Sequence, residues 1–211
     1  MKNLLLLPAF LVVSVGVFPQ EDKVIKLPEP QLDKGIPLMQ AFEKRQSTRN
    51  FSQRDIPVQE MANLLWAANG INRKESGKRT VPTARNRQDI DVYVCNKDGV
   101  FRYDAKEHAL VTINNNDVRS MTGTQAYVAT APANLIIVSD LDKMEGDRES
   151  NIQTASIEAG FVSQDIYLYC ASENMATVVR GSIDRDKLAA AMELKPNQYI
   201  IVGQTVGYPA E

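Results

Sequence analysis

The chain has 211 residues, of which 44% are hydrophobic and 24% are charged, as in a globular protein of one domain or at most two. Its 24 Lys and Arg residues against 26 Asp and Glu residues give a formal net charge of −2. This balance indicates no nucleic-acid partner and no acidic disordered tail. A single histidine and two cysteines exclude a multi-histidine metal site and a C-x-x-C redox pair, so no metal site is predicted.

The first 20 residues have the pattern of a signal peptide. Lys2 precedes an apolar run from Leu4 to Phe18, and polar residues begin at Gln20. A positive start, an apolar segment shorter than the roughly 20 residues of a membrane span and a polar exit are typical of secretory signals. We therefore expect residues 1–20 to be removed and the protein to be exported to the periplasm, with no stable membrane association afterwards. An uncleaved N-terminal anchor is the alternative.

Residues 21–37 contain three prolines and are predicted to form an extended lead-in to a single domain over residues 38–211. Hydrophobic periodicity predicts helices from about 38, over 57–70, 152–173 and 184–192, and two short helical stretches near 116–130. Strand patterns occupy 90–94, 100–103, 134–138, 177–180 and 199–206, while 72–87 is polar and rich in turn residues. Helices and strands mix without strict alternation, which favours an α+β fold over a doubly wound parallel sheet.

The residues that usually carry enzyme chemistry are scarce in this chain. Cys95 and Cys170 fall in apolar patterns and are predicted to be small buried side chains, and their spacing does not reveal whether they form a disulfide. His108 lies in a polar stretch and is predicted to be a solvated surface residue. No G-x-S-x-G elbow, G-x-G-x-x-G loop or P-loop is present. We assign no catalytic side chain and expect a bound cofactor to carry any chemistry.

A basic cluster follows the first predicted helix. Arg45, Ser47 and Arg49 stand at alternate positions, so in an extended segment their side chains point the same way. Two guanidinium groups and a hydroxyl then form a receptor for an anion such as phosphate. A solvated basic patch is the alternative that spacing alone leaves open.

This cluster and the helix after it resemble the opening of the nitroreductase family, whose members bind FMN. The stretch Leu-Leu-Trp-Ala-Ala-Asn-Gly-Ile-Asn-Arg at 64–73 is similar to the branch that includes thiazole- and oxazole-forming peptide dehydrogenases. The resemblance implies that Arg45 and Ser47 hold the phosphate and ribityl oxygens of FMN. It places Arg49 at the ribityl chain or the pyrimidine edge of the flavin. The family's C-terminal basic residues have no counterpart after Pro209, so phosphate binding is expected to depend more on Arg45.

Two later stretches resemble the same family. Pro82, Thr83, Ala84 and Asn86 match a loop that meets the flavin of the other subunit, where the Asn bonds the rim of the isoalloxazine ring. The long helix and the strand after it resemble a part of the family that ends in a turn. In the family the backbone N–H groups of this turn lie by the flavin N5, and here they belong to Val179, Arg180 and Gly181. The resemblance therefore implies a homodimer, and a central, mostly antiparallel sheet flanked by helices.

The function implied is that of an FMN-dependent oxidoreductase, which passes two electrons from a donor such as NAD(P)H to a small organic acceptor such as a nitro or quinone compound. Export would separate the protein from the cytoplasmic NAD(P)H pool, in which case either the electron donor differs or the reaction is a flavin-dependent oxidation. A non-catalytic flavin-binding protein that keeps the fold is the first alternative. A secreted structural dimer without flavin is the second.

Overall fold

The computed structural model describes residues 23–210 of the chain. The predicted signal peptide lies outside this range. Part of the lead-in, β1 (Val24–Lys26), is paired as an edge strand of the main sheet. No helix among the described residues is long and apolar enough to cross a membrane.

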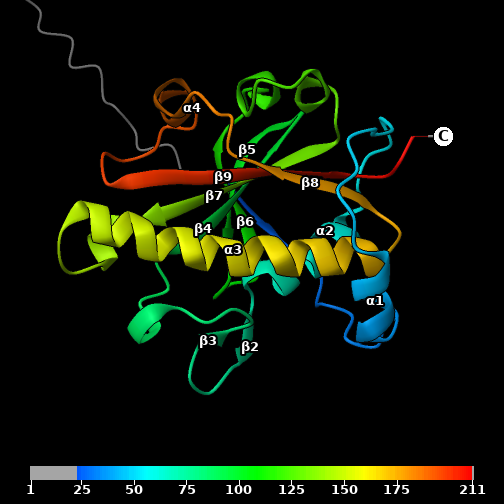
Figure 1. The fold of residues 1–211 in the computed structure, drawn as a ribbon, viewed down its shortest axis with the longest axis horizontal. Helices are drawn as coiled ribbons and strands as arrows, with labels where there is room; N and C mark the ends of the chain where they lie inside the picture. Colours follow the sequence, from blue (N-terminus) through cyan, green and yellow to red (C-terminus); the bar gives the residue numbers. More distant parts are fainter. Residues whose placement is uncertain (1–22, 211) are drawn as a thin grey trace, which may run out of the picture.

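Seven strands of the described chain form one sheet, in the order β1-β6-β5-β4-β7-β9-β8, and every neighbouring pair is antiparallel (Figure 1). Besides β1, the strands are β4 (Ile90–Asn96), β5 (Gly99–Asp104), β6 (Ala109–Asn114), β7 (Ala133–Asp140), β8 (Ala176–Arg180) and β9 (Gln198–Gly207). A separate hairpin pairs β2 (Ile71–Arg73) with β3 (Lys78–Arg79). The predicted α+β class with an antiparallel sheet is confirmed.

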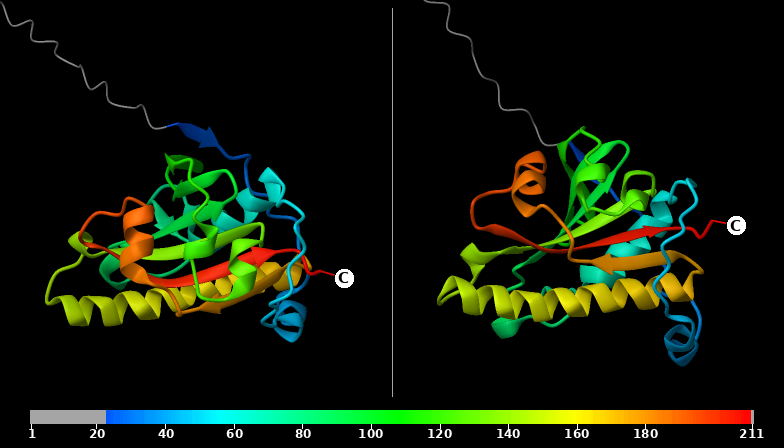
Figure 2. Two further views of the ribbon diagram at one scale, coloured as in Figure 1. Left: turned by 90° about the horizontal axis from the view of Figure 1, so that it is seen from above. Right: turned by 45° about the horizontal axis from the view of Figure 1, so that its top comes forward.

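Helices cover both faces of the sheet (Figures 1 and 2). On one face α2 (Val58–Asn69) and α3 (Arg148–Ser172) pack on Val92, Leu135 and other apolar residues of the central strands. On the other face α4 (Arg185–Ala191) contributes Leu188 to a smaller core with Tyr93 and Ile136. The remaining helix, α1 (Leu38–Lys44), lies beside one end of α3.

The helix boundaries follow local chemistry. Helix α2 starts after Pro57 and ends before Gly70, as predicted, because proline is tolerated at a helix start and the residues between recur at helical spacing. Helix α3 begins four residues earlier than predicted. The carboxylate of Asp147 accepts a hydrogen bond of 2.9 Å from the backbone N–H of Ser150, which caps a polar first turn that apolar periodicity does not reveal.

Other parts of the chain differ from the sequence-based prediction. Strand β6 was not predicted, and the polar stretch 72–87 contains the β2–β3 hairpin and a 3₁₀ turn (Ala84–Asn86). The two helical stretches near 116–130 are 3₁₀ turns, at Arg119–Met121 and Ala126–Ala129.

Cys95, Cys170 and His108 were considered above for their chemistry, and all three are held within the fold. Cys95 and Cys170 are free and completely buried, so the prediction of small buried side chains is confirmed. The prediction that His108 is solvated is wrong. Its ring is half-buried, with Nδ1 at 2.8 Å from the hydroxyl of Tyr103 and Nε2 at 2.9 Å from the carbonyl oxygen of Pro28. The lead-in folds over this edge of the sheet and supplies the second partner.

Candidate functional site

The predicted anion-binding segment is extended and lies against the sheet. Helix α1 ends at Lys44 because the backbone of Arg45 leaves the helical region at ψ 119°. The chain then runs beside β8, where the N–H of Thr48 donates to the carbonyl oxygen of Thr177 at 2.9 Å. Further on, Phe51 forms an isolated β-bridge with Pro209. Along this extended segment, the side chains of Arg45 and Ser47 both approach the same residue, Tyr167 of α3.

Tyr167 of α3 is the point where this segment, α3 and β8 meet. Its hydroxyl lies 2.8 Å from the hydroxyl of Ser47 and accepts a hydrogen bond of 3.0 Å from the backbone N–H of Val179. The guanidinium carbon of Arg45 lies 5.3 Å from the centre of the Tyr167 ring, a cation–π distance. The structure thus brings together Arg45, Ser47 and Val179, and it adds Tyr167, which the sequence analysis did not single out.

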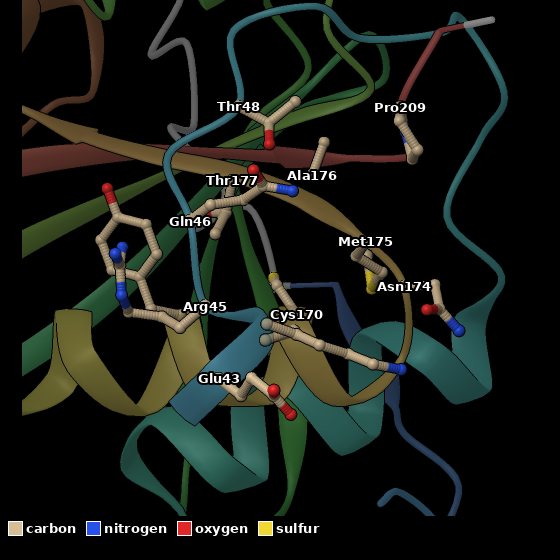
Figure 3. Close-up of a pocket in the computed structure, with 13 residues that line it drawn as sticks. Glu43, Arg45, Gln46, Thr48, Cys170, Asn174, Met175, Ala176, Thr177 and Pro209 are labelled. Carbon is tan, nitrogen blue, oxygen red and sulfur yellow. The ribbon is translucent and has the colours of Figure 1, made fainter. Parts of the chain in front are cut away.

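A pocket of about 460 Å³ lies beside the segment (Figure 3). It is lined by the end of α1, by the last turn of α3, by the start of β8, and by Arg45, Gln46 and Thr48 of the extended segment. Arg45 stands on one side of the pocket, and Asn174 and Pro209 stand on the other. Within residues 23–210, neither Arg45 nor Arg49 forms an ion pair with a carboxylate, and Arg49 is exposed. Both guanidinium groups are therefore available to an anion.

The turn after β8 has an open side. A Cβ added at Gly181 would meet no atom within 4 Å, so the backbone there borders free space. The side chain of Arg180 is instead buried, and its guanidinium group donates to the hydroxyl of Thr205 at 2.6 Å and to the side-chain oxygen of Asn134 at 3.0 Å. Burial lowers the pKa of Arg180 to about 10, so the group stays charged at neutral pH. Only the backbone of Arg180 is left for a ligand.

The loop Pro82–Gln88 lies at a different point of α3. The N–H of Ala84 donates to the carboxylate of Glu158 at 2.6 Å, and the N–H of Gln88 donates to the hydroxyl of Thr83 at 3.0 Å. Arg85, Asn86 and Gln88 have φ of 54°, 56° and 51°, in the left-handed region that few side chains adopt. Three of the four residues from Arg85 to Gln88 thus have a strained backbone, which gives the loop a defined shape. Pro82, Ala84 and Asn86 of this loop are exposed.

Within one chain this loop and the basic segment are apart. Their contacts on α3, Glu158 and Tyr167, are nine residues from each other, which corresponds to about 13 Å along a helix axis. The structure therefore groups Arg45, Ser47 and Val179 around Tyr167 of α3. The loop that carries Pro82, Thr83, Ala84 and Asn86 contacts α3 at Glu158, through the N–H of Ala84. This separation is compatible with a loop that serves a second copy of the chain.

With this geometry established, comparison with known proteins gives a clear result. The sequence model described as "Nitroreductase family" matches residues 42–208. The chain belongs to the nitroreductase family. A protein of Methanocaldococcus jannaschii assigned as a nitroreductase is 28% identical over 189 residues, which cover 83% of this chain and 93% of that protein.

Solved structures agree. A crystal structure from Ralstonia eutropha JMP134, of a protein assigned as a nitroreductase, covers 100% of this chain and 97% of its own, with 39% identity and a TM-score of 0.86. A Staphylococcus epidermidis protein assigned as an NAD(P)H:FMN oxidoreductase superposes over 87% of this chain and 92% of its own, with 15% identity and a TM-score of 0.65. The second similarity shows the fold alone. The nitroreductase-like fold is confirmed, and the family indicates an oxidoreductase.

Proposed function

We propose that this protein is an FMN-dependent oxidoreductase that acts as a homodimer. It would pass two electrons from a donor such as NAD(P)H to a small organic acceptor such as a nitro or quinone compound. The observation that carries the proposal is the meeting of Arg45, Ser47 and Val179 at Tyr167, because it joins two stretches that resemble flavin-binding parts of the family. Arg45 has no carboxylate partner among the described residues, as a phosphate-binding arginine requires.

The residues present fit FMN. The unpaired guanidinium group of Arg45 would bind the phosphate, with Ser47 and Arg49 toward the ribityl chain. The backbone from Val179 to Gly181 would face the flavin ring across the open side of Gly181, where a Cβ would meet no atom within 4 Å. Bound flavin would supply the electron-carrying chemistry, and the protein would supply binding, orientation and electrostatics.

A second copy of the chain would complete the site. Helix α3 exposes Ile157 at 57% and Phe161 at 42%, on either side of the exposed Gly160. Helix α1, in contact with α3, exposes Leu38, Met39 and Phe42. Apolar side chains gathered on neighbouring helices are typical of a surface that another molecule covers. Pairing over this face supports the proposal that the loop with Asn86 serves the partner's flavin.

The electron donor depends on where the protein acts, which is a further proposal. The name of the Staphylococcus epidermidis protein supports NAD(P)H as donor. We also propose that residues 1–20 direct export to the periplasm, in which case a different donor or a flavin-dependent oxidation is expected. The similarity of residues 64–73 to the thiazole- and oxazole-forming branch supports the oxidation.

The first experiment is a visible absorption spectrum of the chain purified from Glu21 onward, before and after addition of FMN. We expect flavin bands in the wild type and their loss in an Arg45→Ala/Arg49→Ala variant. Arg148→Ala is the matched control, because Arg148 is an exposed arginine at the opposite end of α3. A colourless protein that takes up no FMN would overturn the proposal. Bound FMN without turnover by any donor would favour the non-catalytic flavin-binding alternative.

A further inference from the structure

Two carboxyl groups are buried together beneath the loop Pro82–Gln88. The side chain of Glu158, on α3, accepts the 2.6 Å hydrogen bond from the N–H of Ala84, and the residue is 3% exposed. Asp89, at the end of the loop, is completely buried and accepts a hydrogen bond of 2.7 Å from the hydroxyl of Ser139 on β7. Each carboxyl group thus has one oxygen bonded to the protein around it.

The other two oxygens have no such bond. Within residues 23–210, neither Oε2 of Glu158 nor Oδ1 of Asp89 has a hydrogen-bond partner. The two carboxyl groups are close enough to form a hydrogen bond with each other when one of them carries a proton. A buried polar atom without a partner is costly, and a shared proton would satisfy both oxygens at once.

The charged groups around the pair do not neutralise it. Arg87 faces Glu158, but its guanidinium group lies 3.6 Å from Glu145. Arg79 faces Asp89, but its guanidinium group donates to the side-chain oxygen of Gln88 at 3.0 Å and to the carbonyl oxygen of Ile90 at 3.3 Å. From the turn Leu141–Lys143, Lys143 donates to the carbonyl oxygen of Gln88 at 3.2 Å and lies 3.8 Å from Asp91. Burial, with a smaller contribution from Asp89, raises the pKa of Glu158 to about 7. Two buried carboxylates without a bonded cation repel each other, so one of them retains a proton.

We propose that Glu158 and Asp89 share one proton and that this protonated pair positions the loop Pro82–Gln88. Glu158 is a positioning residue: it acts through the N–H of Ala84. The proposal rests on the proposed function only in what the loop contacts, namely the flavin of the partner subunit. The loop needs such a support because Arg85, Asn86 and Gln88 hold strained backbone conformations, which persist only where the surroundings impose them.

The proposal predicts a dependence on pH. When the shared proton is lost, two negative charges face each other in the interior, and the favourable response is for Glu158 to move toward solvent. Ala84 then loses its acceptor and the loop loosens. The ordered loop is therefore expected below the pKa of Glu158 and is lost as the pH rises through it.

The first measurement is amide hydrogen exchange of Ala84 in the flavin-free protein at pH 6.0 and pH 8.5, corrected for the intrinsic exchange rate. In the wild type we expect protection to fall by about tenfold or more, because each pH unit above a pKa lowers the protonated fraction about tenfold. Glu158→Gln keeps an acceptor for Ala84, and its amide can donate to Asp89. We expect this variant to stay protected at both pH values.

The second measurement is the FMN dissociation constant, from quenching of flavin fluorescence in the same proteins. FMN phosphate itself titrates near pH 6, so variants are compared with the wild type at each pH. We expect the wild type to lose about tenfold in affinity between pH 6.0 and pH 8.5 relative to Glu158→Gln. Asp165→Asn is the matched control, because it removes a different carboxyl group of α3, one that is partly buried, and leaves the pair intact.

The outcomes separate this proposal from the proposed function. Protection of Ala84 that is independent of pH in the wild type, or the same pH dependence in Glu158→Gln, would overturn it. Should Glu158→Gln fail to fold, Asp89→Asn neutralises the pair from the other side and is expected to give the same pH-independent protection. The expected exchange pattern without any FMN binding would leave the shared proton in place and overturn the flavin function.

Discussion

The hydroxyl groups of Ser47 and Tyr167 lie 2.8 Å apart, although 120 positions separate the two residues in the chain. Because the Tyr167 oxygen also accepts the N–H of Val179, its own proton is free for Ser47. One phenol thus fixes the segment after α1 relative to β8. In the proposed function these are the two elements that hold the phosphate end and the ring of the flavin.

Replacing Tyr167 with Phe should weaken both the fold and the site. The change leaves the half-buried N–H of Val179 without its acceptor and releases Ser47. An unsatisfied donor costs about 1–3 kcal/mol when it is fully buried, so about 1 kcal/mol is expected here. We expect the free energy of unfolding in urea to fall by that amount. The FMN dissociation constant should rise by roughly tenfold, since 1.4 kcal/mol corresponds to a factor of ten.

Tyr169→Phe provides the control for this prediction. Tyr169 lies on the same helix and its hydroxyl donates to Glu60, away from Ser47. This variant should lose stability without a change in FMN affinity. Equal losses of affinity in the two variants would contradict a specific role for Tyr167 and indicate a general loosening of α3.

Much of this fold could be predicted from the sequence because its central elements have strong patterns. Alternation of apolar residues identified β4, and helical spacing between Pro57 and Gly70 identified α2. Strand β6 and the first turn of α3 were not predicted, for physical reasons. Strand β6 lies between β5 and the short edge strand β1, so one of its two neighbouring strands comes from the lead-in. The first turn of α3 depends on a polar cap.

The candidate site was predictable only in part. Arg45 and Ser47 were found through spacing and resemblance, and the structure places them together. The part played by Tyr167 depends on three segments meeting in space, and one aromatic residue in a helix gives no signal of that. Glu158 and Asp89 were missed because acidic residues are almost always exposed, so sequence gives no reason to expect a buried pair.

A second prediction concerns Asp165, a partly buried carboxyl group on α3 beside Trp66 and Leu168. Within residues 23–210 its carboxylate has no hydrogen bond or ion pair, and burial alone raises its pKa to about 6. An acid whose pKa is higher in the folded than in the unfolded protein destabilises the fold when it ionises. The free energy of unfolding should therefore fall as the pH rises from about 4 through about 6.

Asp165→Asn should remove this dependence. We expect the variant to be more stable than the wild type by about 1 kcal/mol at pH 7.5, an amount reduced for partial solvent screening, and equally stable at pH 4. Urea unfolding at the two pH values measures the difference. Glu75→Gln is the control, because it removes the same charge at an exposed position of the β2–β3 turn. A stabilisation that is the same at both pH values would contradict the assigned cause.

The last prediction tests the proposed pairing of two copies through α3. A Cβ at Gly160 would meet no atom within 4 Å, so Gly160→Arg fits the single subunit and should stabilise the helix by up to about 1 kcal/mol. It also places a charged side chain between the exposed Ile157 and Phe161. Light scattering after gel filtration should show dimers for the wild type and monomers for the variant. FMN binding should be lost with the dimer, since each site then lacks the partner's loop.

Ala190→Arg introduces the same side chain at an exposed position of α4, on the other face of the sheet, and should leave the dimer and FMN binding unchanged. A Gly160→Arg variant that remains dimeric would show that the face around Phe161 is not the interface. A monomeric variant that binds FMN as tightly as the wild type would show that Arg45 and Ser47 hold the flavin without the loop Pro82–Gln88. The two measurements together therefore separate the subunit contact from the cofactor contact.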